Sequence, residues 1–326
     1  MQIAKAVVLA GDCRGSAPWP SVGVAARQLA PVANRPVLYH QLDALRSAGV
    51  TEAAIVTDGT TGACIRGAVG DGSDWGIELI HLEYHGTSNV LACSSVAAFV
   101  GTAPVLVQHG DVLLRERLSV LQDEFALRDL DALILCPGAG SKAAYGPAGF
   151  IIGPHVHQRL RRGAALDDVL EQLRAAGARI GVREVDACMP CRGGAEELLE
   201  ANRRMLDQLS PDCRGERVFE SEIQGTVALH PSAEVRASVV RGPVAIGPGA
   251  RIANAYIGPY TSIGADVQID CVEIEHSIVL DSAHISCLEA RVEGSVVGPG
   301  ARVSRDFRLP RALRLSIGEG AQVLVS

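Results

Sequence analysis

The C-terminal third of the chain carries an aliphatic residue at about every sixth position. From residue 240 onward these residues are Val240, Ile246, Ile252, Ile257, Ile263, Ile269, Val297 and Val303. Gly follows several of them and permits a sharp corner. A short strand in each repeat cannot bury its own apolar side, so successive repeats must stack. The pattern predicts a β-solenoid, with irregular loops where the step shortens to five residues, at 252–257 and 269–274.

The N-terminal half alternates two kinds of hydrophobic pattern. Apolar runs predict strands at 6–10, 53–57, 77–82 and 104–107, and amphipathic segments predict helices at 37–48 and 90–100. Strands separated by helices form a mostly parallel sheet, which binds ligands beyond the carboxyl ends of its strands. We expect the turn after Ala10 and the side chain of Asp111 to share that edge.

Composition adds the domain count and excludes some partners. With 326 residues, of which 48% are hydrophobic, the chain is long enough for an α/β domain at 1–220 and a repeat domain at 221–326. The net charge of −7 and the dispersed charges argue against nucleic-acid binding. The opening apolar run is too short to span a membrane, and nine scattered cysteines favour reduced thiols. These features predict a cytoplasmic protein without membrane contact.

Four segments carry a resemblance to a known family. They are KAVVLAG at 5–11, RQLAPVANRPVL at 27–38, HGD at 109–111 and LLEANR at 198–203. These segments resemble the glucose-1-phosphate thymidylyltransferases, and the tail, with YIGPYTSIG at 256–264, is similar to their long form. The resemblance covers nearly the whole chain. It implies a doubly wound, mostly parallel nucleotidyltransferase sheet, a C-terminal left-handed parallel β-helix and a homo-oligomer.

The family's reaction joins a sugar-1-phosphate to the α-phosphorus of a nucleoside triphosphate and releases pyrophosphate. Backbone amides, cationic side chains and Mg²⁺ held by two Asp residues neutralise the phosphates. By resemblance, Asp111 is the first magnesium ligand, Gln28 reads the base, and Arg27 replaces a phosphate-binding Lys. The other nucleotide-binding positions are Ala10, Gly11 and Gly110. Without the resemblance, Asp111 is a strand-end cap and Arg27 a solvated surface charge.

Other positions depart from the family's pattern. The phosphate loop, G-G-x-G-T-R-L in the family, is GDCRGSAPWP at 11–20, where Arg14 is the candidate replacement for the missing Arg. The second magnesium Asp falls on Cys191, and a thiol is a poor ligand for magnesium. Asp186 lies five residues upstream of it. The segment between Cys136 and Phe150, which forms the sugar-phosphate side of the family's pocket, is much shorter here.

These departures leave three hypotheses. The leading one is a catalytically degenerate homologue that serves as a binding, regulatory or scaffolding subunit, with a nucleotide or sugar nucleotide, an active paralogue or another protein as partner. The first alternative is an active nucleotidyltransferase that uses Arg14, Arg27, Asp111 and Mg²⁺, with Asp12 or Asp186 assisting. The second is a repurposed enzyme with His109 or the Cys191 thiol in the old nucleotide cleft.

Some remaining Cys and His residues invite other interpretations. Cys188 and Cys191 have the spacing of a zinc or redox pair, but no second pair follows at a zinc-finger spacing. We expect His155 and His157 to be surface residues. His276 lies within a segment similar to the family, so we expect a structural or exposed role for it.

Overall fold

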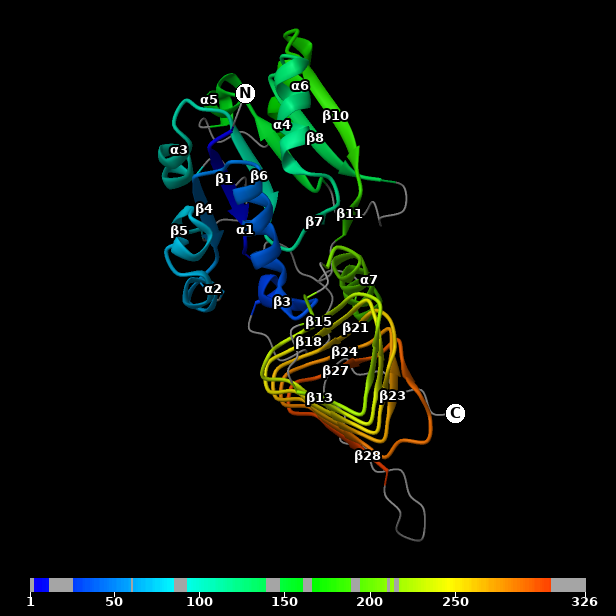
Figure 1. The fold of residues 1–326 in the computed structure, drawn as a ribbon. Coiled ribbons are helices and arrows are strands. Elements are labelled where there is room, and N and C mark those ends of the chain that lie inside the picture. The colour runs from blue at the N-terminus through cyan, green and yellow to red at the C-terminus, as the bar shows by residue number, and fades with distance from the viewer. Residues whose placement is uncertain are drawn as a thin grey trace. The chain divides into compact units, whose positions relative to one another are not determined.

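The computed structural model describes residues 3–11, 26–59, 61–84, 93–138, 147–160, 166–188, 194–209, 212–213 and 217–305. These residues belong to two compact units (Figure 1). Among the described residues, those within 3–11, 26–29 and 37–188 belong to the first unit, and those within 30–36 and 194–305 belong to the second. The sequence boundary at residue 220 stays a prediction. Among the described residues, no helix is both long and apolar enough to cross a membrane.

The first unit is built on a seven-stranded sheet. Its strands are β1 (Lys5–Leu9), β4 (Glu52–Thr57), β5 (Glu78–Glu83), β6 (Val105–His109), β8 (Ala132–Pro137), β9 (Gly149–Ile152) and β10 (Ile180–Val185). They lie in the order β10-β8-β9-β6-β1-β4-β5, and only β9 runs antiparallel to its neighbours. The predicted mostly parallel α/β sheet is confirmed.

Helices and 3-10 turns lie between these strands in the sequence. They are α1 (Val37–Ser47), α2 (Gly62–Val69), α3 (Ser94–Val100), α4 (Leu118–Leu127), α5 (Pro154–Leu160) and α6 (Leu166–Ala175), with 3-10 turns η1 (Arg27–Leu29) and η2 (Ser73–Trp75). In α1 the buried residues include Leu38, Leu42 and Leu45 at helical spacing. Their burial confirms the helix that the amphipathic pattern predicts.

A short ladder follows β6 and β10 in the same unit. Strand β7 (Leu113–Leu114) pairs antiparallel with β11 (Ala187–Cys188), so that Leu114 faces Ala187 and Leu113 faces Cys188. The sequence pattern does not predict these strands, because each is only two residues long. These two strands bear on the expected magnesium site, because Asp111 lies just before β7 and Asp186 just before β11.

The second unit contains a left-handed parallel β-helix made of three sheets. The first sheet has β12 (Asp212–Cys213), β15 (Val227–Leu229), β18 (Val244–Ile246), β21 (Thr261–Ile263), β24 (Ile278–Val279) and β27 (Val296–Val297). The second has β13 (Val218–Phe219), β16 (Glu234–Arg236), β19 (Arg251–Ala253), β22 (Gln268–Asp270), β25 (His284–Ser286) and β28 (Arg302–Ser304). The third has β14 (Glu222–Gln224), β17 (Val239–Arg241), β20 (Tyr256–Ile257), β23 (Glu273–Glu275) and β26 (Val292–Glu293).

The coils of this β-helix are regular over most of its length. Val235 lies over Ile252, and Ile252 over Ile269, at a repeat of 17 residues. Two steps of six and one of five make up each such coil, so the five-residue step recurs at one corner. The irregular loops expected at 252–257 and 269–274 are therefore wrong, because the shorter step is part of the repeat. The stacked aliphatic residues form one buried core.

Two further elements complete the second unit. They are helix α7 (Ala195–Leu206) and the hairpin of β2 (Pro31–Val32) and β3 (Arg35–Pro36). Ala33 at the hairpin turn packs with Leu206 of α7 and with Ala245 of the β-helix. The unit thus assembles segments that are far apart in the sequence.

Candidate functional site

The carboxyl ends of β1, β4 and β6 come together at one edge of the sheet. Leu9 faces His109 in the β1–β6 ladder, so Ala10 and Gly110 lie just beyond the paired residues. The Gly110 amide donates to the Leu9 carbonyl at 2.7 Å, and the Ala10 amide donates to the Val56 carbonyl at 2.7 Å. The predicted sharing of this edge by residues 10 and 111 is confirmed.

Gly110 permits the close approach of η1 to this edge. A Cβ atom at residue 110 would lie 3.0 Å from Cγ of Gln28 and 3.2 Å from Cβ of Ala10. Both distances are shorter than ordinary carbon contacts, so even Ala would displace Gln28. The absence of a side chain at residue 110 therefore places Gln28 beside the two strand ends.

Gln28 is a buried amide whose acceptor oxygen has no hydrogen-bond donor among the described residues. Its side chain is only 4% exposed, and its Oε1 atom has no hydrogen-bond partner among the described residues. Leaving a buried acceptor unpaired costs about 1–3 kcal/mol. An N–H donor from a ligand, such as the imide N–H of thymine or uracil, would satisfy it.

Asp111 is also buried, at 5% exposure. The turn that carries it is fixed by Gln41, whose Nε2 donates at 2.5 Å to the carbonyls of both His109 and Val112. A buried carboxylate needs hydrogen bonds, a cation or a metal ion around it. Its hard oxygen atoms are the ligand type that Mg²⁺ prefers, so this position fits a magnesium ligand.

Arg27 precedes Gln28 in η1 and is half-buried. It is therefore more enclosed than the solvated surface charge that is the alternative to phosphate binding. Gly11 follows Ala10 at the end of β1 and is also half-buried. Three other candidates, Asp12, Arg14 and Cys191, lie outside the described residues.

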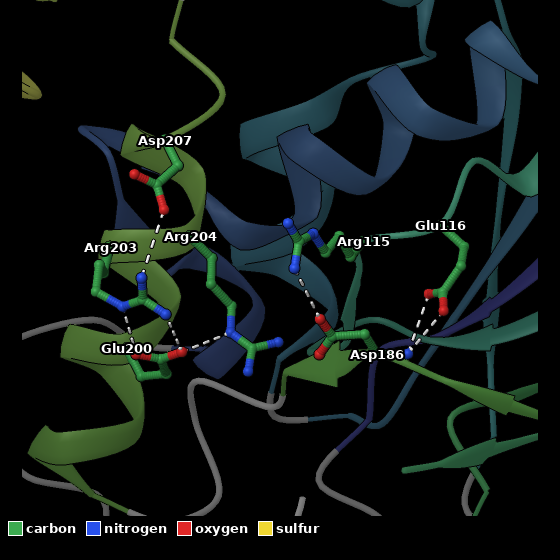
Figure 2. Close-up of polar contacts among 7 residues, drawn as sticks. All are labelled: Arg115, Glu116, Asp186, Glu200, Arg203, Arg204 and Asp207. Atoms are coloured by element: carbon green, nitrogen blue, oxygen red, sulfur yellow. Dashed lines mark hydrogen bonds and ion pairs between the residues drawn. The ribbon is translucent and has the colours of Figure 1, made fainter. Parts of the chain in front are cut away.

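Asp186 contacts other groups at the β7–β11 ladder. Its carboxylate lies 3.6 Å from Nη1 of Arg115, and its carbonyl accepts from the Arg115 amide at 3.0 Å. The Asp186 amide donates to both carboxylate oxygens of Glu116, at 2.9 and 3.1 Å (Figure 2). The ladder thus sets Asp186 against Arg115 and Glu116. Sequence inspection missed these partners, because Glu116 lies 70 positions from Asp186, with Arg115 next to it, and neither shares a spacing motif with Asp186.

Comparisons with known proteins agree with this geometry. The family model described as nucleotidyl transferase matches residues 5–151. The chain is 30% identical to a glucose-1-phosphate thymidylyltransferase of Streptomyces griseus, over 99% of each chain. It is 29% identical to a low-salt glycan biosynthesis nucleotidyltransferase of Haloferax volcanii, over 98% of this chain and 99% of that one.

A solved structure shares the fold. It is a proposed glucose-1-phosphate thymidylyltransferase of Bacillus anthracis in complex with sucrose. The TM-score is 0.50 at 16% identity, and the match covers 64% of this chain and 97% of that chain. At this level of identity the likeness concerns the fold.

Proposed function

The chain belongs to the glucose-1-phosphate thymidylyltransferase family, and from this premise we propose that it binds a nucleotide or sugar nucleotide but transfers nucleotidyl groups poorly. Its role is then that of a binding, regulatory or scaffolding subunit. The nucleotide lies at the carboxyl ends of β1 and β6. An active paralogue or another protein is the partner that such a role requires.

The binding half of this proposal rests on buried Gln28, whose Oε1 atom has no hydrogen-bond partner among the described residues. A primary amide offers one donor and one acceptor side by side, which complements the adjacent carbonyl and imide N–H of thymine or uracil. Gly110 leaves the room that this amide occupies. The base-recognition part of the site therefore supports nucleotide binding.

The catalytic half of the proposal rests on the magnesium ligands. Asp111 supplies a buried carboxylate, whereas the second family position is Cys191. Asp186, the nearest upstream carboxylate in the sequence, contacts Arg115. Removing one preorganised electrostatic group from such a site typically lowers the rate by about 10²–10³-fold. A magnesium ion held by Asp111 would still neutralise phosphate charge, but with fewer oxygen ligands from the protein.

The alternative of an active enzyme also has support in the structure. Arg27 and Gln28 are consecutive residues of η1, and Gln28 contacts the strand end that leads into Asp111. Two of the residues that an altered active site would use thus lie in one region of the unit. This alternative predicts that Asp111→Asn abolishes turnover.

Calorimetry tests the binding half. We expect deoxythymidine triphosphate or deoxythymidine-diphosphate-glucose to bind the purified chain, with and without magnesium. Gln28→Met, which keeps the volume but removes both hydrogen-bonding atoms, should weaken binding about tenfold. Gln268→Met, at an exposed position of β22, is the matched control and should bind normally. Absence of binding by both ligands, or normal binding by Gln28→Met, would contradict this half.

Pyrophosphate release tests the catalytic half. The wild-type chain should turn over slowly with deoxythymidine triphosphate and glucose-1-phosphate. Cys191→Asp, which restores an oxygen ligand, should raise the rate by about 100-fold. Cys191→Ser is the control, because it removes the thiol without adding a carboxylate. Robust wild-type turnover that disappears in Asp111→Asn would establish the active alternative instead.

A further inference from the structure

Two cysteines lie on adjacent coils at one corner of the β-helix. Cys271 follows β22 and Cys287 follows β25, and these strands pair with Asp270 opposite Ser286. The Cys287 amide donates to the Asp270 carbonyl at 2.9 Å. The next residues in register are therefore Cys271 and Cys287, stacked at the strand spacing of about 4.8 Å.

A carboxylate joins these two thiols. The Sγ atoms of Cys271 and Cys287 and a carboxylate oxygen of Asp270 all lie within 4.8 Å of one another. In a tetrahedral zinc site with Zn–S distances of about 2.3 Å, the ligand atoms are about 3.8 Å apart. The three groups thus need to close by at most about 1 Å, which rotation of side chains at the surface can supply. Cys271 is exposed, and the other two residues are partly buried.

Asn254 on the preceding coil orients the carboxylate. Its Nδ2 atom donates to Oδ1 of Asp270 at 3.0 Å, and its backbone amide is fixed by the Arg236 carbonyl at 3.1 Å. Hydrogen bonds of this kind hold ligating carboxylates in place in metal sites. The orientation of Asp270 is therefore set before any ligand binds.

The charge of the cluster also favours a cation. The Asp270 carboxylate brings a negative charge to the two thiols, and a bound cation stabilises their thiolates. Arg305, the residue after β28, forms an ion pair with Glu289.

We propose that Cys271, Cys287 and Asp270 form a binding site for a divalent cation that prefers sulfur ligands, such as zinc. A water molecule completes four-coordination. Two sulfur ligands select zinc over magnesium, which takes oxygen ligands. All residues of this site belong to the second unit, whereas Gln28 and Asp111 belong to the first.

A disulfide is the alternative for two thiols at this spacing, because stacked Cα atoms about 4.8 Å apart are within disulfide range. A disulfide leaves no role for the Asp270 carboxylate, whereas a metal site uses it as a third ligand. The carboxylate and its hydrogen bond to Asn254 therefore favour a metal site.

Titration of the reduced full-length chain with Co²⁺ tests the site. Binding should produce the thiolate-to-cobalt charge-transfer band at one equivalent, and Zn²⁺ should abolish that band by displacement. Cys271→Ser and Cys287→Ser should each lose it, and Asn254→Ala should bind about tenfold more weakly. Two variants are matched controls that should retain the band: Cys64→Ser, which replaces an exposed cysteine of α2, and Cys191→Ser.

Three results would overturn the proposal. One is the absence of a saturable band, and another is a band that survives in the Cys271→Ser/Cys287→Ser double variant. The third is loss of the band in Cys191→Ser, which would place the metal at the Cys188–Cys191 pair. Far-ultraviolet circular dichroism and the urea midpoint of each variant separate loss of ligand from loss of fold. A Cys271–Cys287 disulfide in air-oxidised protein, combined with no metal binding by reduced protein, would identify a redox pair instead.

Discussion

The buried amide of Asn202 connects three segments of the second unit. Its Oδ1 accepts from the Ala33 amide at 2.9 Å and from Oγ of Ser262 at 2.6 Å, and its Nδ2 donates to the Tyr260 carbonyl at 3.1 Å. We expect Asn202→Ala to lower the free energy of unfolding by about 2–3 kcal/mol, because it leaves several buried groups unpaired. Urea denaturation measures this loss. Gln208→Ala, an exposed amide just after α7, should change it by less than about 0.5 kcal/mol.

Glu200 on the same helix makes stability depend on pH. It accepts hydrogen bonds from Arg203 and Arg204 (Figure 2), and these, with Arg203 the larger cause, lower the pKa of Glu200 from 4.5 to about 2. A lowered pKa stabilises the folded state above pH 4.5, and this contribution disappears as the pH falls toward 2. Since the Glu200 side chain is 38% exposed, solvent screening reduces the effect to about 1 kcal/mol.

The corresponding experiment compares urea unfolding of wild type and Glu200→Gln at two pH values. At pH 7 the variant should be less stable by about 1 kcal/mol, and at pH 3 the gap should be smaller. Glu293→Gln, at an exposed position of β26, controls for removing a surface carboxylate. A gap that is the same at both pH values would show that the ion pairs of Glu200 do not contribute.

Residue identity predicts such roles only where the partners are close in sequence. The segment LLEANR at 198–203 identifies the family, but the partners of Asn202 lie 169 and 60 positions away. The sequence pattern also predicts His157 at the surface. This prediction is wrong, because His157 is only 1% exposed. It lies on the inner side of α5, one residue after buried Val156, whereas His155 is exposed as expected. A helix of seven residues with mixed polarity does not reveal which side faces the core.

At the scale of elements, the β-helix depends on its stacked aliphatic columns. Ile269 of β22 is 1% exposed and lies between Ile252 and Ile285 on the neighbouring coils. Ile269→Ala should reduce the unfolding free energy by about 2–5 kcal/mol, because it removes buried methyl groups and leaves a cavity inside the stack. Chemical denaturation monitors the change. Exposed Gln268→Ala on the same strand should cost far less, and equal losses in the two variants would argue against the core column.

The elements that the sequence predicts are those with a strong local period. The stacked repeat, the strand at β1 and the helix at α1 follow from residues within one window, and the structure confirms them. The β7–β11 ladder does not follow, because each strand has two residues and its pairing joins segments about 70 positions apart. The position of Asp186 depends on this ladder, so sequence alone left open whether Asp186 lies near Asp111. Prediction of the site was therefore limited to the ends of the strongly predicted strands.

At the scale of the whole molecule, the chain enters the second unit early and then leaves it. Residues 30–36 belong to that unit, although the described residues on either side of them, 26–29 and those from 37 onward up to 188, belong to the first. A boundary drawn at residue 220 from pattern alone cannot show this, because the hairpin is short and its contacts are tertiary. Asn34 makes one of them, donating from Nδ2 to the Ile263 carbonyl at 2.7 Å.

Hydrogen exchange at Asn34 variants tests this division. The Ile263 carbonyl also accepts from the Gly247 amide at 2.7 Å, so loss of the Asn34 bond should speed exchange in the neighbouring coils. Asn34→Gly removes only the side-chain bond, worth about 1 kcal/mol, or roughly fivefold in exchange. Asn34→Ala should have a larger effect, since φ at residue 34 is 62° and Ala is unfavourable in that region by a further ~1 kcal/mol. The amides of β4 in the first unit should be unaffected in both variants. Faster exchange in β4, with the β-helix unchanged, would mean that the hairpin stabilises the first unit rather than the second.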